Sequence, residues 1–248
     1  MIKIENATFK RSDKIIFKDY SFDIEQADII AILGPNGRGK TTLLKTILNL
    51  LPLTKGNISI DAQIAYVPQN SQLIFDFTVL DVVLMGRVKH LKFFSNPSKK
   101  DYNLAYESLE ILNIKEFADR NFSELSGGEK QLVLIARAIV SQCNFLVLDE
   151  PASALDFSNQ KKVLNKLKFL NLKQKMTILY STHYPQHAFY LSNKVLLMFE
   201  NNYLFDETEK LMTEKILSKL YGMDIKEVDF EINGEYIKTV IPIFNNIY

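Results

Sequence analysis

The hydrophobic pattern of the chain first predicts three buried strands. The stretches DIIAIL (28–33), FLVLD (145–149) and MTILYSTH (176–183) are short and largely apolar, without the alternation of a half-exposed strand. Strands covered on both faces, as in the middle of an α/β sheet, carry such runs. We therefore expect these stretches to lie in one central sheet.

Between and after these strands the pattern changes to helical spacing. KTTLLKTILNLL (40–51) repeats leucine and isoleucine every three or four residues, which predicts an amphipathic helix. From about residue 70 to 124, DVVLMGRVKHLKFF and KDYNLAYESLEILNI predict helices separated by a turn around Pro97. YLFDETEKLMTEKILSKLYGMD predicts a strand end followed by a helix, and Asn233-Gly234 predicts a closing hairpin.

Composition narrows the class of protein further. The 248 residues are 47% apolar, which can bury a sizeable core, and 30 basic against 29 acidic residues give a net charge of +1. This balance provides no basic field for nucleic acid, so we expect no nucleic-acid partner. The N-terminal sequence resembles no leader and no run reaches about 18 apolar residues, so we expect a cytosolic chain. The single cysteine, Cys143, is expected to be a buried thiol.

The stretch GPNGRGKT (34–41) satisfies the pattern G-x-x-x-x-G-K-[ST] between a predicted strand and a predicted helix. Its glycines let backbone N–H groups converge on phosphate oxygens at a helix N-terminus. Lys40 is predicted to reach the terminal phosphates, and the Thr41 hydroxyl to bind Mg²⁺. This stretch therefore predicts a nucleoside triphosphate site.

Two carboxylates end the strand FLVLDE (145–150). Acidic residues at strand ends are often helix caps or solvated turns. Beside a phosphate loop, however, Asp149 is expected to be a second contact to magnesium, and Glu150 to orient the attacking water.

The stretch LSGGEKQ (125–131) predicts a helix start. Ser126 and Glu129 have the spacing of a capping box ahead of the apolar helix LVLIARAIV. The cap does not explain Gly127 and Gly128, because glycine in a first turn costs about 1 kcal/mol relative to alanine. We expect a ligand to approach the helix closely here, which would give the chain a second anion site.

These three segments, in this order, resemble the ATP-binding cassette (ABC) family over essentially the whole chain. In that family two cassettes face each other head to tail, and each ATP lies between one chain's phosphate loop and the other chain's signature. The resemblance therefore implies that LSGGEKQ serves the partner's nucleotide. It implies ATP-binding residues Gly34, Pro35, Asn36, Gly37, Arg38, Gly39, Lys40, Thr41 and Thr42 in the loop, with Ser126, Gly127, Gly128 and Glu129 in the signature.

Further family positions can be matched to this sequence. Gln69 resembles the glutamine that joins magnesium and the attacking water, Asp156 the aspartate that communicates across the dimer, and His183 the histidine near the γ-phosphate. The resemblance thus implies Lys40, Gln69, Glu150 and His183 as catalytic residues, and Thr41, Gln69 and Asp149 as magnesium ligands. His90 and His187 are expected to be bystanders.

Three positions depart from the family pattern. Arg11 stands where an aromatic residue usually stacks on adenine, and its guanidinium could stack instead. Arg38 replaces a small residue before Gly39 and adds positive charge near the phosphates. Glu129 replaces the usual signature glutamine, which the capping box tolerates.

The resemblance implies one α/β domain over 1–248. A P-loop core with a mixed central sheet and a small N-terminal antiparallel β region would cover about 1–69 and 126–248, and a helical subdomain about 70–125. The segments FTVLDVVLMGR (77–87) and LMTEKILSKLYGM (211–223) are similar to those of importers of iron siderophores, haem and cobalamin, a subfamily with a molybdate lineage. We expect the apolar residues of 77–87 to exceed what the helical insertion can bury, and so to dock a membrane subunit.

The expected function is that of the ATPase subunit of such an importer, at the cytoplasmic face of the inner membrane. Its expected cofactors are ATP and Mg²⁺. Its expected partners are a second copy of itself, membrane permease subunits and, indirectly, a substrate-binding protein. An alternative is a soluble cassette protein acting on DNA or ribosomes, but those usually have a coiled coil or two cassettes in one chain. A phosphotransferase would leave LSGGEKQ and SALD (153–156) unexplained.

Overall fold

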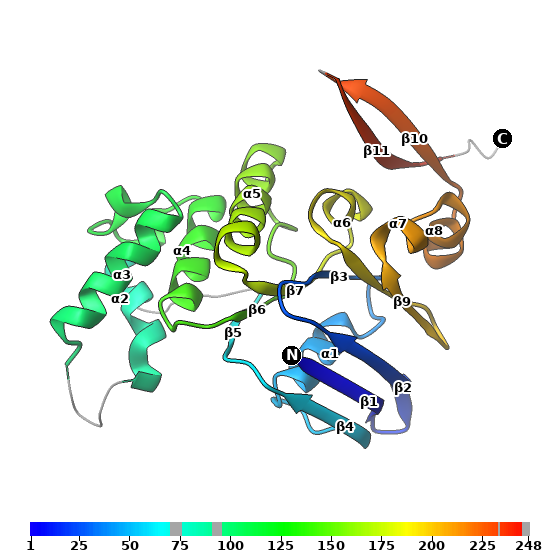
Figure 1. Cartoon of the computed structure of the whole chain (residues 1–248), viewed down its shortest axis with the longest axis horizontal. Helices are drawn as coiled ribbons and strands as arrows, with labels where there is room; N and C mark the ends of the chain where they lie inside the picture. Colours follow the sequence, from blue (N-terminus) through cyan, green and yellow to red (C-terminus); the bar gives the residue numbers. More distant parts are fainter. Residues whose placement is uncertain (70–75, 91–95, 233, 245–248) are drawn as a thin grey trace. The chain divides into compact units, whose positions relative to one another are not determined.

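Figure 1 shows the computed structural model, which describes residues 1–69, 76–90, 96–232 and 234–244. The chain forms two compact units, residues 1–61 with 178–248 (unit 1) and residues 62–177 (unit 2). The division into a core and a helical subdomain at residues 70 and 125 stays a prediction.

Unit 1 begins with the small antiparallel sheet expected at the N-terminus. Its strand order is β2-β1-β4, with both pairs antiparallel. Alternate positions such as Ile2 and Ile4 are buried, which is the pattern of a sheet with one covered face. The strands are β1 (Ile2–Arg11), β2 (Lys14–Ile24) and β4 (Lys55–Ile60).

Unit 1 also contains the strands that carry the phosphate loop. Strand β3 pairs in parallel with β7 and β8, and β9 pairs antiparallel with β8, so the sheet is mixed as predicted. Every residue of β3 is buried, which explains its continuous apolar run. The strands are β3 (Ile29–Leu33), β7 (Thr177–Ser181), β8 (Lys194–Met198) and β9 (Tyr203–Glu207).

The two helices predicted in unit 1 both differ in extent from the sequence pattern, and α6 (Pro185–Leu191) was not predicted. Helix α1 (Lys40–Ile47) ends earlier than the predicted 40–51. The single helix expected after β9 is divided into α7 (Thr208–Leu211) and α8 (Glu214–Tyr221), because Thr213 accepts a hydrogen bond from the N–H of Ile216 and caps a new helix.

Unit 1 ends in the predicted hairpin, formed by β10 (Ile225–Ile232) and β11 (Glu235–Pro242). The hairpin follows α8 in the chain and continues beyond it in Figure 1. Gly234 has a φ of +82°, as a tight turn requires. Asn233, the other residue of the predicted turn, lies outside the described residues.

Unit 2 contains the predicted helical insertion together with the strand that ends in the two carboxylates. Helix α4 packs against α2, α3 and α5, and β5 (Ile64–Val67) pairs in parallel with β6 (Phe145–Leu148). The predicted segment 91–94 lies outside the described residues. The helices are α2 (Val79–Leu84), α3 (Lys99–Ile111), α4 (Gly127–Ile139) and α5 (Phe157–Gln174), with 3₁₀ turns η1 (Met85–His90), η2 (Lys115–Phe117) and η3 (Phe122–Glu124).

Residues 77–87 bury only some of their apolar side chains and leave Phe77, Leu80 and Met85 partly exposed, so the docking of this segment on a membrane subunit stays a prediction. Val79, Val82, Val83 and Leu84 are all buried, because α2 packs against α4. Beyond this segment, Val88 is 64% exposed. In the part of the chain that the structure describes, no helix has the length and apolar character of a membrane span.

Candidate functional site

The phosphate loop connects β3 to α1 in unit 1. Gly37 and Gly39 have φ values of +80° and +93°, so the loop uses the left-handed region that glycine tolerates. The ammonium of Lys40 donates to the carbonyl oxygen of Gly34 at 2.8 Å and lies 3.4 Å from that of Pro35. This lysine is only 6% exposed, and its charge therefore lies against the loop that would hold the phosphates. Thr41 and Thr42 follow in the first turn of α1.

Gly39 is required for a second reason. A Cβ atom at this position would lie 2.3 Å from the Cγ2 atom of Ile16 on β2. The antiparallel sheet therefore reaches the phosphate loop through Ile16, a residue that the sequence analysis did not select. This contact places an apolar side chain at the start of the helix that follows the loop.

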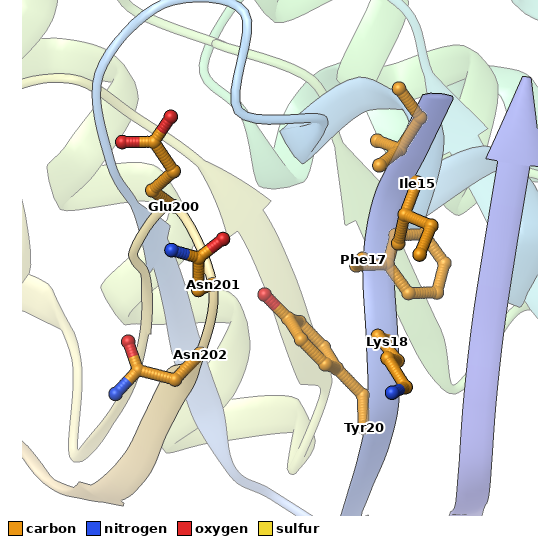
Figure 2. Close-up of a pocket in the computed structure, with 8 residues that line it drawn as sticks. Ile15, Phe17, Lys18, Tyr20, Glu200, Asn201 and Asn202 are labelled. Carbon is orange, nitrogen blue, oxygen red and sulfur yellow. The ribbon is translucent and has the colours of Figure 1, made fainter. Parts of the chain in front are cut away.

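The charge of Arg38 is directed towards the turn between β8 and β9. Its Nη2 atom lies 3.5 Å from Oε2 of Glu200, in an ion pair that is largely exposed and hence weak. Glu200 also lines a pocket of about 130 Å³ between this turn and β2. Figure 2 shows the ring of Tyr20 directed from β2 towards Asn201 and Asn202 on the other side of this pocket.

Arg11, the predicted adenine platform, is the last residue of β1 and pairs in register with Lys14. Its side chain is exposed, and Arg11 is not one of the residues that line the pocket in Figure 2. The stacking of Arg11 on adenine stays a prediction.

His183 follows β7 in unit 1, and its ring lies 4.0 Å from the ring of Tyr184. His187 is buried and lies near the Thr182 hydroxyl at 3.3 Å, and burial together with the neighbouring charge of His183 lowers the pKa of His187 to about 4. A buried histidine with this pKa is neutral at physiological pH, which fits the role of a bystander. His90 contacts the backbone carbonyl of Ser141 at 3.2 Å in unit 2.

In unit 2, two predicted catalytic residues are in direct contact. The Nε2 atom of Gln69 donates to Oε2 of Glu150 at 3.2 Å, although 81 positions separate them in the chain. The parallel pairing of β5 with β6 brings both strands to an end at the same edge, which places these two residues together. Asp149 directly precedes Glu150 and is 3% exposed. Burial, and then the charge of Asp149, raise the pKa of Tyr66 to about 12.

Gln69 and Glu150 open into a cavity of about 220 Å³ within unit 2. The cavity is also lined by Gly127, Lys130 and Gln131 from the LSGGEKQ stretch. Within the described part of the chain, the Nε2 atom of Gln131 is buried without a hydrogen-bond partner. Gln131 was not selected from the sequence, and it presents an unused donor on the helix that the signature begins.

The capping box of LSGGEKQ is confirmed. Glu129 accepts from the N–H of Ser126 at 2.8 Å, and Ser126 Oγ accepts from the N–H of Glu129. Hydrogen bonds from Ser126 lower the pKa of the Glu129 carboxyl group. Packing within the chain also explains the glycine at position 128, because a Cβ on Gly128 would lie 2.6 Å from Cγ of Asn159 on α5. Close helix packing therefore requires Gly128, whatever ligand approaches it.

Asp156 is the N-cap of α5. Its two carboxylate oxygens accept from the N–H and the side-chain amide of Asn159 at 2.8 and 3.0 Å. The same asparagine packs against Gly128, so Asp156 is linked through one residue to the signature helix.

The fold and these motifs agree with one family. The model for the family "ABC transporter" matches residues 17–153, and the chain belongs to this family. It is therefore an α/β ATP-binding cassette, a subunit that binds ATP and hydrolyses it to drive transport.

Two relatives cover almost the entire chain. The molybdate import ATP-binding protein MolC of Haemophilus influenzae is 38% identical over 99% of this chain and 98% of its own length. A solved inward-facing structure of a "metal-chelate type ABC transporter" has a TM-score of 0.95 and 38% identity, covering 98% of this chain and 97% of its own. Neither relative supports the alternative of a soluble protein acting on DNA or ribosomes.

A third similar structure is a dimeric ATP-binding cassette in a post-hydrolysis state, bound to ADP and Pi. It is 26% identical, with a TM-score of 0.72 over 84% of this chain and 99% of its own. Cassettes of this family thus form dimers with nucleotide.

Proposed function

We propose that this chain is the ATPase subunit of an importer for a metal chelate, such as an iron complex, haem or cobalamin, or for an oxyanion such as molybdate. Similarity to the molybdate import protein and to the metal-chelate type transporter over nearly the whole chain supports this range of cargo. All residues assigned to a site in this chain would bind or hydrolyse ATP, or bind Mg²⁺. Specificity for the cargo would therefore reside in the membrane subunits and the substrate-binding protein.

ATP would bind with its phosphates on Lys40 and on the backbone N–H groups of residues 34–42, except at Pro35, which has no N–H group. The helix N-terminus of α1 contributes positive potential at this point. Magnesium prefers oxygen ligands, and Thr41, Asp149 and Gln69 offer a hydroxyl, a carboxylate and an amide oxygen. Gln69 uses its amide nitrogen in the contact with Glu150, so its oxygen is the atom suited to the metal. When bound, Mg²⁺ neutralises charge on the phosphates.

The contact between Gln69 and Glu150 is the observation that carries the proposed mechanism. Glu150 would orient the attacking water, and Gln69 holds this carboxylate at the mouth of the cavity. His183 would contact the γ-phosphate. Lys40 would exchange its loop carbonyl partners for phosphate oxygens, which stabilises the charge of the transferring group.

The assembly would be a head-to-tail homodimer docked on permease subunits at the cytoplasmic face of the inner membrane. Ser126, Gly127, Gly128 and Glu129 of one chain would complete the ATP site of the other. Asp156 supports this role because it shares Asn159 with Gly128. The family's dimeric cassette bound to ADP and Pi supports the pairing of two chains.

The test of the mechanism is the Glu150→Gln variant in the assembled complex. We expect ATP binding close to that of wild type and an ATPase rate lower by about 10²- to 10⁴-fold, since the amide cannot accept the proton of water. Glu107→Gln, at another position of unit 2, is the matched control and should keep full activity. Near-normal turnover of Glu150→Gln, measured together with nucleotide affinity, would contradict the role of Glu150.

A further inference from the structure

The turn between β8 and β9, residues 199–202, starts in contact with the first residue of the phosphate loop. Strand β8 pairs in parallel with β3, and the register places Leu197 beside Leu33, the residue before the loop. A Cβ atom on Gly34 would lie 2.8 Å from the carbonyl oxygen of Met198, the last residue of β8. The backbone that enters the turn is therefore packed directly against the loop that would hold the phosphates.

The other end of the turn is fixed on β2. The hydroxyl group of Tyr203, the first residue of β9, accepts a hydrogen bond from the N–H of Ser21 at 2.8 Å and donates one to the carbonyl oxygen of Ser21 at 2.7 Å. The turn itself is closed by the N–H of Phe199, which donates to the carbonyl oxygen of Asn202 at 3.0 Å. Both ends of the turn are therefore anchored within unit 1.

The anchored turn presents a carboxylate to the arginine of the phosphate loop. Arg38 lies between Gly37 and Gly39, and its Nη2 atom donates to Oε2 of Glu200 at 3.5 Å. Figure 2 shows Glu200 on the turn, next to Asn201 in the wall of the pocket. The charged end of Arg38 is therefore held by the turn, outside the loop that would contact the phosphates.

The two cations of the phosphate loop are held in different ways. Lys40 is buried against the carbonyl oxygens of the loop itself. The side chain of Arg38 is 34% exposed and that of Glu200 is 72% exposed, so water screens this ion pair and a better anion can displace it. Guanidinium groups bind phosphate oxygens through paired hydrogen bonds. A nucleotide on the loop would therefore compete with Glu200 for Arg38.

We propose that Glu200 is a positioning residue that limits nucleotide affinity by holding the Arg38 guanidinium away from the phosphates. This inference rests on the proposed binding of the phosphates to residues 34–42. When ATP binds, Arg38 must leave Glu200 to reach a phosphate oxygen, and the loss of the ion pair reduces the gain in affinity. After hydrolysis, Glu200 competes for Arg38 with ADP, which carries less negative charge than ATP. The turn would thus favour release of the product.

A purely structural role for the ion pair would act on the stability of the chain instead. The turn is already held by Tyr203 and by the packing of Gly34 on Met198, neither of which involves the Glu200 side chain. An exposed ion pair adds little to stability. We therefore expect urea unfolding of the nucleotide-free Glu200→Gln variant to match that of wild type, and a marked loss of stability would contradict the positioning role.

Equilibrium binding of ADP to the complete complex tests the inference. We expect Glu200→Gln to bind ADP about two- to fivefold more tightly than wild type, the range that an exposed ion pair supplies. The KM for ATP should fall by a similar factor without a rise in kcat. The matched control is Glu207→Gln, which removes an exposed carboxylate paired with Lys210 at the opposite end of β9 and should leave ADP affinity unchanged. Unchanged or weaker ADP binding by Glu200→Gln would overturn the inference.

A double-mutant cycle separates the contact with Arg38 from the general field of the Glu200 carboxylate. Removing any negative charge near the phosphates favours an anion, whether or not Arg38 is involved. If Glu200 acts through Arg38, adding Glu200→Gln to an Arg38→Gln background should produce no measurable further change in ADP affinity. An equal gain in both backgrounds would refute the positioning role.

The Lys40→Ala variant separates this inference from the proposed phosphate site. If residues 34–42 hold the phosphates, Lys40→Ala should lose affinity for ADP in the same binding measurement. Should Lys40→Ala bind ADP as wild type does, the phosphate site itself is refuted, and the role of Glu200 with it. If Lys40→Ala loses affinity while Glu200→Gln binds ADP as wild type does, only the role of Glu200 is overturned and the phosphate site stands.

Discussion

At the scale of single residues, Glu150 combines a predicted catalytic role with an unfavourable backbone. Its φ is +50°, in the left-handed region, which costs about 1–3 kcal/mol for a residue other than glycine. Two contacts help to hold it there, the hydrogen bond from Gln69 to its carboxylate and that from Ser153 Oγ to its carbonyl oxygen at 3.1 Å. These contacts hold Glu150 in its unfavourable backbone conformation and so fix the direction of its carboxylate. A group that orients water requires such a fixed direction.

Gly128 yields a prediction about stability at the same scale. Alanine at this position would force Asn159 and the start of α5 to move, and we expect a loss of about 1–3 kcal/mol from overpacking. Gly127→Ala is the matched control, because its Cβ would lie 3.3 Å from the flexible tip of Leu155 and its effect should be much smaller. Urea unfolding measures both variants.

A double variant tests whether the loss of stability comes from the contact with Asn159. Gly128→Ala combined with Asn159→Ala should recover part of the lost stability, since Cγ and Oδ1 of Asn159 are removed, whereas its Cβ, 2.8 Å from the added methyl group, remains. If Gly128→Ala is as stable as wild type, the packing of α4 on α5 does not require a glycine.

The contrast between predicted and missed residues at this scale follows from their separation in the chain. Ser126 and Glu129 were recognisable as a capping box because three positions separate them, and local spacing determines the contact. The contact of Ile16 with the phosphate loop joins residues 23 positions apart, and the buried amide of Gln131 depends on the cavity around it. No pattern in the sequence indicates contacts of these kinds.

At the scale of elements, a buried ion pair ties the helices of unit 2 together. The Nε atom of Arg87 in η1 donates to Oδ1 of Asp101 in α3 at 2.8 Å, and both side chains are almost fully buried. The Nη1 atom of Arg87 also donates to the carbonyl oxygen of Val140 at the end of α4. Asp101 is at the same time the third residue of the Ser98 capping box. The Asp101 carboxylate therefore caps the N-terminus of α3 and, through Arg87, links this helix to η1 and to the end of α4.

A helix or strand could also be predicted only where a local pattern in the sequence determines it. Strands β3 and β6 were predicted because complete burial produces continuous apolar runs. The break between α7 and α8 was missed because the helical pattern continues across it, while a single hydroxyl, that of Thr213, starts the new helix. The side chains of α2 that are buried could not be predicted, because the partner helix α4 lies far along the chain.

Asp101 predicts how stability depends on pH. Hydrogen bonds from Ser98 and then Arg87 lower the pKa of this carboxyl group well below its usual value of 3.8. A group whose pKa is depressed in the folded state stabilises the fold above its unfolded value, and this contribution is lost as the pH falls towards the folded value. We expect the free energy of unfolding to decrease below about pH 4 more steeply in wild type than in Asp101→Asn.

The measurement is urea unfolding at a series of pH values from neutral to acidic. Glu110→Gln is the control, because Glu110 pairs with Lys115 in an exposed ion pair of 3.4 Å and should barely change the slope. Parallel curves for wild type and Asp101→Asn below pH 4 would show that the ion pair does not drive acid unfolding.

At the scale of the whole molecule, the proposed dimer would build each ATP site from two chains. The phosphate loop belongs to unit 1, while LSGGEKQ and the Gln69–Glu150 pair belong to unit 2. In the proposed dimer each ATP would use the loop and Glu150 of one chain and the signature of the other. Two defects in different chains therefore distinguish a shared site from a site within one chain.

Ser126→Arg should block the partner's γ-phosphate, and Glu150→Gln should remove the carboxylate that orients water, so each homodimer should be nearly inactive. In the mixed dimer of one Ser126→Arg chain and one Glu150→Gln chain, sharing places both defects in one site and leaves the other site intact. Some ATPase activity should then return, below half of wild type if the two sites must close together. Differently tagged chains, isolated as heterodimers with the membrane subunits, allow this rate to be measured. If each site used its own signature, both sites of the mixed dimer would stay defective, and its rate would not exceed that of either homodimer.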